Sequence, residues 1–167
     1  MNIDSLRYIL LFVIISIAQV IILSNIRLFG FATPMLQIYF ILRFRRGYPQ
    51  SLLLLWAFAM GLILDSFANT PGIGTASMTL IALIQPYLLE SFMQRESEPD
   101  LKPSLASLGL PKYLLYATVI TLTYCLTFFT LENFSFFNFS QWILSIIGCF
   151  IFTLIVVIVF ESVRNSQ

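Results

Sequence analysis

One stretch of the chain, residues 56–79, combines a carboxylate with helix breakers and paired glycines inside hydrophobic sequence. Its acid, Asp65, ends an apolar run. Charge is expensive in lipid, so such a carboxylate is a candidate ion or proton site, or a polar contact to a partner helix. Alternatively, it accepts hydrogen bonds from the following turn at Asn69 and Thr70 and fastens a helical hairpin. The sequence favours the structural role over direct chemistry.

Residue types give little support to catalysis. The chain has no histidine, which removes serine–histidine and cysteine–histidine catalysis and most metal sites. An aspartyl protease needs two carboxylates that share a proton, and Asp65 has only Glu132, in a different loop, on its side of the membrane. Cys125 and Cys149 lie in apolar runs, where we expect buried thiols and no disulfide. We expect no enzyme activity, catalytic residue, metal or cofactor.

Composition defines the class of protein. Of the 167 residues, 59% are hydrophobic and 10% are charged, against about 25% charged in soluble domains. The apolar runs are continuous, which predicts membrane helices and not the alternating strands of a barrel. A net charge of +1 without a basic patch excludes nucleic acid as a partner. The fold class is an all-α polytopic membrane protein.

The apolar runs predict six transmembrane helices in a single domain, residues 1–167. Their approximate bounds are 8–26, 28–42, 50–65, 71–89, 113–131 and 139–160. From Pro34 onward, the second run is too short to cross a bilayer alone. It therefore either spans together with the residues before it or forms a re-entrant segment. We expect Thr33 to be the N-cap of the second helix. For the fourth helix we expect Asn69 or Thr70 as the N-cap, with Pro71 in the first turn. A short interfacial helix is expected at 104–110.

Basic residues predict the orientation. With the N-terminus inside and six crossings, the inside segments hold eight lysines and arginines and the outside segments only Arg27. This asymmetry places both termini in the cytoplasm. The inside set includes a basic turn of Arg43, Arg45 and Arg46, which could also bind anionic membrane lipid.

Small residues continue along the face that carries the acid. Ala57, Gly61 and Asp65 follow one another at intervals of four, so they share one helix face and permit close helix contact. Gly72 and Gly74 of the turn have no adjacent lysine or arginine. We therefore expect them to serve tight packing and not an anion site.

Three local patterns occur in order along the chain. A proline opens the second segment, which runs to a basic turn, and a glycine stands four residues before the aspartate that ends the third. A turn then leads into the fourth helix. The residues that carry these patterns are Pro34, Arg45, Arg46 and Pro49; Gly61 and Asp65; and Thr70, Pro71, Gly72, Ile73 and Gly74. In these patterns, in size and in the number of apolar segments, nearly the whole chain resembles the rod shape-determining MreD family. The second segment departs from the family, since Gln37 and Arg43 shorten its apolar run.

The resemblance implies a non-enzymatic component of the bacterial elongasome in the cytoplasmic (inner) membrane, which binds MreC and supports lateral peptidoglycan synthesis and cell shape. MreB, RodA and a class B penicillin-binding protein are the further implied partners. It also implies that the hairpin and the outer helix ends form a groove for a partner helix, with Gly61 permitting close approach.

The MreD family is similar in fold to the S-components of energy-coupling-factor transporters. The alternative function is therefore the substrate-binding subunit of a small-molecule (vitamin) transporter. S-components often carry alanines along the first helix for docking, whereas the first helix here is rich in Ile, Leu and Val, with Ala18 alone. This favours the shape protein.

Overall fold

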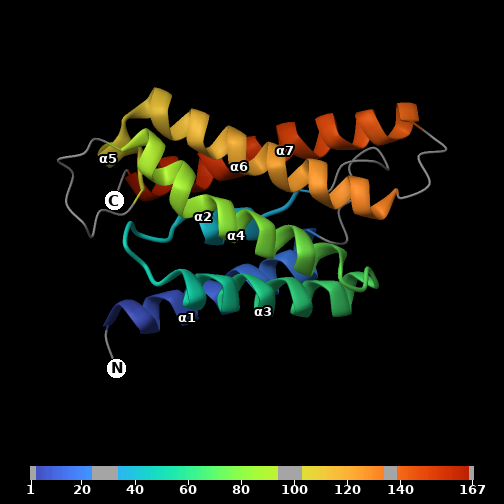
Figure 1. The fold of residues 1–167 in the computed structure, drawn as a ribbon, viewed down its shortest axis with the longest axis horizontal. Coiled ribbons are helices and arrows are strands. Elements are labelled where there is room, and N and C mark those ends of the chain that lie inside the picture. The colour runs from blue at the N-terminus through green and yellow to red at the C-terminus, as the bar shows by residue number, and fades with distance from the viewer. Residues whose placement is uncertain (1–2, 24–33, 94–102, 134–138, 166–167) are drawn as a thin grey trace.

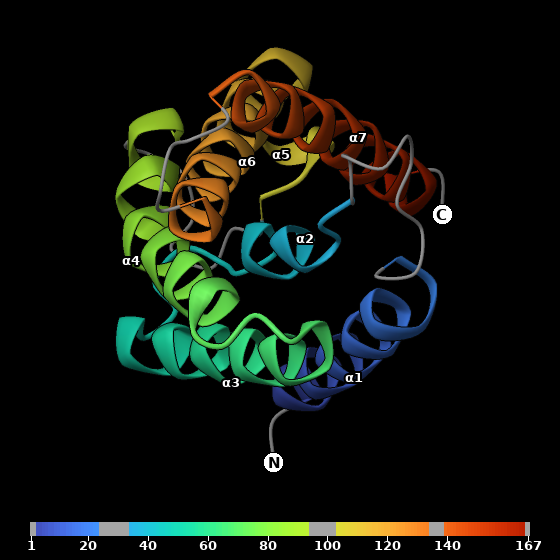
Figure 2. The ribbon, with the colours of Figure 1, turned by 90° about the vertical axis from the view of Figure 1, so that its right-hand side faces the viewer.

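Helices make up the fold of the residues that the computed structural model describes, 3–23, 34–93, 103–133 and 139–165, and no strand occurs among them. The long helices form a ring, seen end-on in Figure 2, and the short α2 lies inside it. The ring consists of α1 (Ile3–Ala18, continued by the π-helical η1, Gln19–Leu23), α3 (Gln50–Ala68), α4 (Ile73–Phe92), α6 (Leu110–Glu132) and α7 (Phe139–Asn165). The inner helix α2 is Gln37–Leu42, and the single-turn α5, Leu105–Leu108, precedes α6.

Four helices of the described chain are long and apolar enough to cross a membrane. They are Gln50–Ala68, Ile73–Phe92, Leu110–Glu132 and Ser140–Arg164. At 1.5 Å per residue, about 20 residues cover a hydrocarbon core of about 30 Å. The apolar part of α1, Tyr8–Ile21, is shorter. The chain is a multi-pass α-helical membrane protein, and four of the six predicted spans are present as full-length apolar helices.

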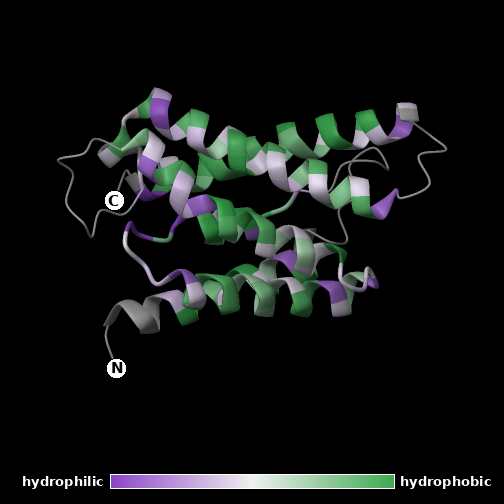
Figure 3. Ribbon diagram, in the orientation of Figure 1, coloured by the Kyte–Doolittle hydropathy of each residue, from purple (hydrophilic) through white to green (hydrophobic). Residues whose placement is uncertain are grey.

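The chain runs back and forth between the two ends of the molecule (Figure 1). The first turn of α1, the α2–α3 turn, the start of α6 and the last turn of α7 lie at the left end. The α3–α4 turn lies at the right end. Hydrophobic residues extend along the helices, and polar ones concentrate toward both ends (Figure 3). This is the distribution that a bilayer around the middle of the ring would require.

The long helices extend beyond their apolar runs. Helix α3 ends at Ala68 and not at residue 65. Helix α6, predicted as 113–131, begins at Leu110, and α7, predicted as 139–160, continues to Asn165. Polar residues at these ends still make helical backbone hydrogen bonds, so the length of the apolar run underestimates the length of the helix. The first helix begins earlier than predicted, at Ile3, and residues 24–26 of its predicted range lie outside the described residues. The turn α5 falls within the predicted interfacial helix.

The predicted helix over residues 28–42 is wrong for residues 34–36, because helix α2 comprises only Gln37–Leu42. Six residues rise about 9 Å, far less than a bilayer. Pro34 is not its first residue, since Leu36 occupies the N-cap position; Thr33 and the rest of residues 28–33 lie outside the described residues. Every residue from Pro34 to Leu42 is buried. Irregular backbone at membrane depth is tolerated only under such protein cover.

Side chains from the ring satisfy the backbone of this central segment, which we define as residues 34–44. Gln19 accepts a hydrogen bond from the Leu36 N–H at 2.8 Å and donates to the Pro34 carbonyl at 3.1 Å. The Met35 N–H donates to Thr153 Oγ1 at 3.1 Å. These bonds replace the helical bonds that the segment lacks, so Gln19 of η1 and Thr153 of α7 hold it in place.

The remaining helices hold the central segment by side-chain contacts. The Gln37 amide donates to the Tyr124 hydroxyl of α6. Gln85 of α4 donates to the Phe44 carbonyl at 3.4 Å. The apolar side chains of α2 complete the core, since Ile38 and Ile41 are fully buried. The interior of the ring is therefore filled by the chain itself.

Candidate functional site

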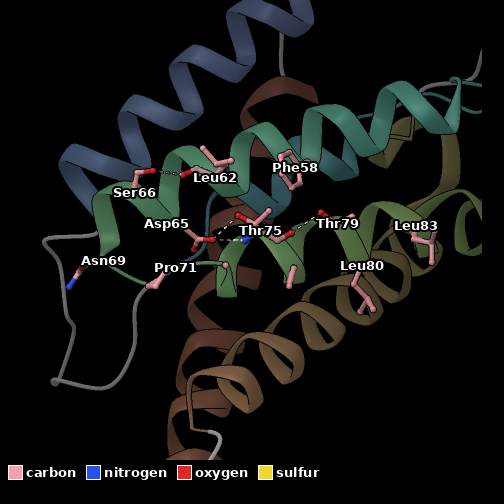
Figure 4. Close-up of a pocket in the computed structure, with 12 residues that line it drawn as sticks. Phe58, Leu62, Asp65, Ser66, Asn69, Pro71, Thr75, Thr79, Leu80 and Leu83 are labelled. Carbon is pink, nitrogen blue, oxygen red and sulfur yellow. Dashed lines mark hydrogen bonds between the residues drawn. The ribbon is translucent and has the colours of Figure 1, made fainter.

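Asp65 joins α3 to the turn and the start of α4 through four hydrogen bonds. Figure 4 shows the bonds to Thr75. Its Oδ1 accepts from the Gly74 N–H at 2.8 Å and the Thr70 hydroxyl at 3.1 Å. Its Oδ2 accepts from the Thr75 N–H at 2.8 Å and the Thr75 hydroxyl at 2.7 Å. The positive end of the α4 dipole favours a carboxylate at this position. Asp65 thus has the structural role that the sequence favoured, with Thr70 as the donor in the turn.

The turn itself is built from two residues in the left-handed region. Asn69 ends α3 with φ 56°, and its N–H donates to the Asp65 carbonyl. Gly72 precedes α4 with φ 85° and supplies no side-chain cap. The predicted N-cap at Asn69 or Thr70 is therefore wrong, as is the placement of Pro71 within the helix. Asp65 of the preceding helix binds the free N–H groups of the first turn instead.

Glycines let the two helices touch at backbone level. A Cβ on Gly61 would lie 2.5 Å from Thr75 Cα, and one on Gly74 would lie 2.5 Å from Asp65 Oδ1. Ala57, Gly61 and Asp65 are all buried, as their spacing on one face predicted. However, the expectation that Gly61 permits close approach of a partner helix is wrong. Gly61 admits α4 of the same chain, so it is not available to a partner helix.

A groove of about 910 Å³ opens between α3 and α4 beside this hairpin (Figure 4). Its described walls are apolar or small except at the turn, and Asp65 is the only charged residue among them. They consist of Phe58, Leu62, Asp65, Ser66 and Asn69 on the α3 side, and Pro71, Gly72, Thr75, Ala76, Thr79, Leu80 and Leu83 on the α4 side.

The groove faces outward from the ring. Phe58 is 48% exposed, Leu62 49% and Leu83 47%, so these side chains would contact lipid or a neighbour in the membrane. On the α3 side the lining residues lie between positions 58 and 69, and on the α4 side between positions 71 and 83. Each stretch corresponds to at most about 17 Å of helix. The groove therefore covers roughly one half of a bilayer, from the hairpin turn inward.

The hairpin and the basic turn are separate in space. The structure brings Gly61, Asp65, Thr70 and Gly74 together, and it places Asn69, Pro71 and Gly72 along the same turn. The basic turn of Arg43, Arg45 and Arg46 lies at the opposite end of the molecule (Figure 1). Arg43 stacks over the Tyr39 ring there, 5.9 Å from its centroid.

A second polar cluster, which the sequence did not predict, lies at that end. Glu161 of α7 is fully buried, accepts a hydrogen bond from the Tyr39 hydroxyl at 3.1 Å, and pairs with Arg164. A signal for it existed in the spacing. The residues at every fourth position of α7 lead from Cys149 to Glu161, and all are fully buried: Cys149, Thr153, Val157 and Glu161. Such a stripe indicates the inward face of a helix.

The geometry of the hairpin suits binding better than reaction. Both oxygens of Asp65 already accept two hydrogen bonds each, so neither is positioned to take a proton from a substrate. Among the described residues, no three His, Cys, Asp or Glu side chains are grouped so as to hold a metal. No family model, curated protein or solved structure matches the chain. The groove is therefore the feature of the molecule that bears on its function.

Proposed function

We propose that this protein is a non-enzymatic MreD-like scaffold of the bacterial rod-shape complex, which binds MreC in the α3–α4 groove. Through this contact it supports lateral peptidoglycan synthesis and cell-shape maintenance. The observation that carries the proposal is an outward-facing groove built on a rigid hairpin, next to an interior that the chain fills itself.

The walls of the groove suit a transmembrane helix. Gly72 and Ala76 are four residues apart on the α4 side, as are Thr75 and Thr79. Small residues at this spacing let a second helix approach closely, and packing of this kind drives helix association where lipid is as apolar as the protein. Because the hydrogen-bonding capacity of Asp65 is already used within the hairpin, the occupant needs no charge in the membrane.

The distribution of charge supports the proposed orientation. Among described residues the left end in Figure 1 carries all the lysines and arginines near the α2–α3 turn, the start of α6 and the end of α7, together with the acids Glu90 and Glu161. The right end carries Asp65 and Glu132 and no lysine or arginine among the described residues. The positive-inside tendency supports an orientation with both termini in the cytoplasm of a bacterial inner membrane and the hairpin on the outer side. The proposed arrangement is a six-pass, S-component-like bundle in which the second pass contains the central segment.

Other partners follow from the same orientation. MreB, RodA and a class B penicillin-binding protein are the further proposed members of the complex. The basic turn faces the cytoplasm, where filaments and anionic lipid headgroups are available to Arg43, Arg45 and Arg46.

The alternative is a vitamin-binding transporter subunit. A small-ligand site normally encloses most of the ligand surface. The groove here opens on the lipid-facing side, and the centre of the ring is occupied by buried side chains such as Ile38 and Phe40. Both features support the scaffold over the transporter subunit.

Site-directed crosslinking in native membranes tests the proposal. In a background without Cys125 and Cys149, a cysteine is placed in the groove at Leu62 or on the lipid face of α7 at Ile151, which are 49% and 48% exposed. We expect crosslinks to MreC from the groove position and none from α7. Equal capture from both, or none from Leu62, would contradict the groove as the site.

Affinity purification of the tagged full chain from gently solubilised membranes separates the two functions. Recovery of MreC with cell-wall synthases supports the scaffold. Recovery of paired ATPases with a coupling subunit would overturn it, and vitamin binding would then be measured.

Replacement of Asp65 by Ala should give rounder cells. Normal rods at wild-type protein abundance would remove Asp65 from the site.

A further inference from the structure

Two cysteines meet inside the protein where α6 contacts α7. Cys125 Sγ and Cys149 Sγ are 3.7 Å apart, and both residues are fully buried. Thr153, one turn after Cys149, has its hydroxyl 3.8 Å from Cys149 Sγ. The sequence predicted buried thiols and no disulfide, and it contained no sign that the two sulfurs touch. The pair is not part of the groove or of the hairpin.

We propose that Cys125 and Cys149 are an oxidisable dithiol that forms a disulfide between α6 and α7, with a hydrocarbon-soluble quinone as the oxidant. Two S–H bonds break and one S–S bond forms. The two protons and two electrons pass to the quinone, which leaves as the hydroquinone. The sulfurs must approach from 3.7 Å to about 2.05 Å, a movement that side-chain rotation and a small helix shift supply.

The surroundings favour a disulfide over a metal at this site. A monovalent soft metal ion held by two thiolates would leave a net negative charge in the apolar interior, which is costly without further partners. A divalent ion would lack its remaining ligands, because the described residues contain no group of three His, Cys, Asp or Glu side chains that could hold a metal. A disulfide is neutral, so it replaces two weakly polar thiols without adding charge. The contact therefore suits oxidation better than metal binding.

The position of α7 defines the class of oxidant. Its opposite face, with Ile147, Ile151 and Ile155, is about half exposed and would contact the hydrocarbon phase. An oxidant dissolved in that phase meets the sulfurs when α6 and α7 separate locally. A water-soluble oxidant would have to enter through the same apolar surface.

The bond would act on the central segment. Besides packing on α6 (Figure 2), α7 holds that segment through Thr153, which accepts from the Met35 N–H, and through Glu161, which accepts from the Tyr39 hydroxyl. Linking α7 to α6 limits the separation that would release these bonds. The oxidised protein should therefore hold residues 34–44 more firmly than the reduced protein.

The test uses the full chain in lipid vesicles, incubated with a tetrasubstituted benzoquinone or with its hydroquinone. The protein is then denatured, treated with a maleimide and weighed intact. We expect two maleimide adducts, one on each cysteine, after the hydroquinone and none after the quinone, on a chain that stays monomeric. The matched variants Cys125→Ser and Cys149→Ser should each keep their single adduct under both conditions.

Two results would overturn the proposal. One is retention of both maleimide adducts after the quinone, and the other is their loss through dimers or quinone adducts. Hydrogen exchange at the Met35 amide tests the structural consequence. It should slow on oxidation in the wild type and stay unchanged in Cys125→Ser; equal exchange in the oxidised and reduced wild type would refute the coupling to the central segment.

Discussion

Replacing Gly61 by alanine tests whether backbone contact between α3 and α4 holds the hairpin. The new Cβ would lie 2.5 Å from Thr75 Cα and 2.9 Å from Thr75 N. Carbon atoms pack at about 3.5–4.0 Å, so the helices must separate by about 1 Å at this point. The Thr75 N–H donates to Asp65 Oδ2 at 2.8 Å. A separation of that size moves the pair beyond hydrogen-bonding distance.

The expected cost of Gly61→Ala has two parts. Overpacking costs about 1–3 kcal/mol, and loss of a hydrogen bond to a charged group costs about 1.5–3 kcal/mol. Together they predict destabilisation by roughly 2.5–6 kcal/mol. Gly72→Ala is the matched control, because a Cβ there meets nothing within 4 Å and only its φ of +85° is unfavourable. We expect about 1–2 kcal/mol for this control.

The assay is reversible unfolding of the full chain in mixed micelles, followed by helical circular dichroism. The double variant Gly61→Ala, Asp65→Ala tests whether Gly61→Ala acts through the Asp65 hydrogen bonds. If separation of the helices already breaks the Asp65 bonds, the double variant costs less than the sum of the single variants. A Gly61→Ala cost no larger than that of Gly72→Ala would refute the reasoning, and so would full additivity.

Three further substitutions probe the other polar contacts in the same unfolding assay. Asp65→Asn keeps one acceptor oxygen but turns an NH₂ group toward the Thr75 N–H, and should cost about 1–3 kcal/mol. Gln19→Leu leaves the buried Leu36 N–H without its acceptor and should cost about 1–3 kcal/mol, with faster hydrogen exchange at that amide. Glu161→Gln removes the ion pair but keeps an acceptor for the Tyr39 hydroxyl. It should cost about 1–2 kcal/mol, since Arg164 can turn to solvent.

Each of these substitutions has a matched control at an exposed position. Ser66→Ala removes a hydroxyl that donates only within its own helix, Gln141→Leu repeats the glutamine change near the start of α7, and Glu90→Gln repeats the charge change near the end of α4. The controls should stay within about 0.5 kcal/mol of wild type. Costs equal to those of the buried positions would show that the named hydrogen bonds are not the cause.

Contacts between neighbours in the chain were predictable. The donors to Asp65 lie five to ten residues after it, so a helix, a turn and a second helix bring them together almost regardless of the rest of the fold. The shared face of Ala57, Gly61 and Asp65 followed from helix periodicity in the same way. The membrane class followed from composition, because long apolar runs leave a chain no stable alternative in water.

Contacts between distant segments were not predictable. Gln19 and Leu36 are 17 residues apart, and Thr153 and Met35 are 118 apart. Nothing local marks Gln19 or Glu161 as partners of the central segment. Helix spacing predicted a close helix contact at Gly61 but not its partner. The family resemblance implied an outside helix, whereas the close neighbour is Thr75 of the same chain.

The sequence by itself determined that this protein is helical and lies in a membrane, and it favoured the role of Asp65 in fastening the turn after it. Only the tertiary structure decided that the second apolar segment is a short inner helix, and which polar side chains hold it. The physical reason is that lipid is as apolar as a protein core, so hydrophobicity does not distinguish a lipid-facing residue from a buried one. The inward faces are set by polar contacts and close packing, and these exist only once the ring has closed around residues 34–44.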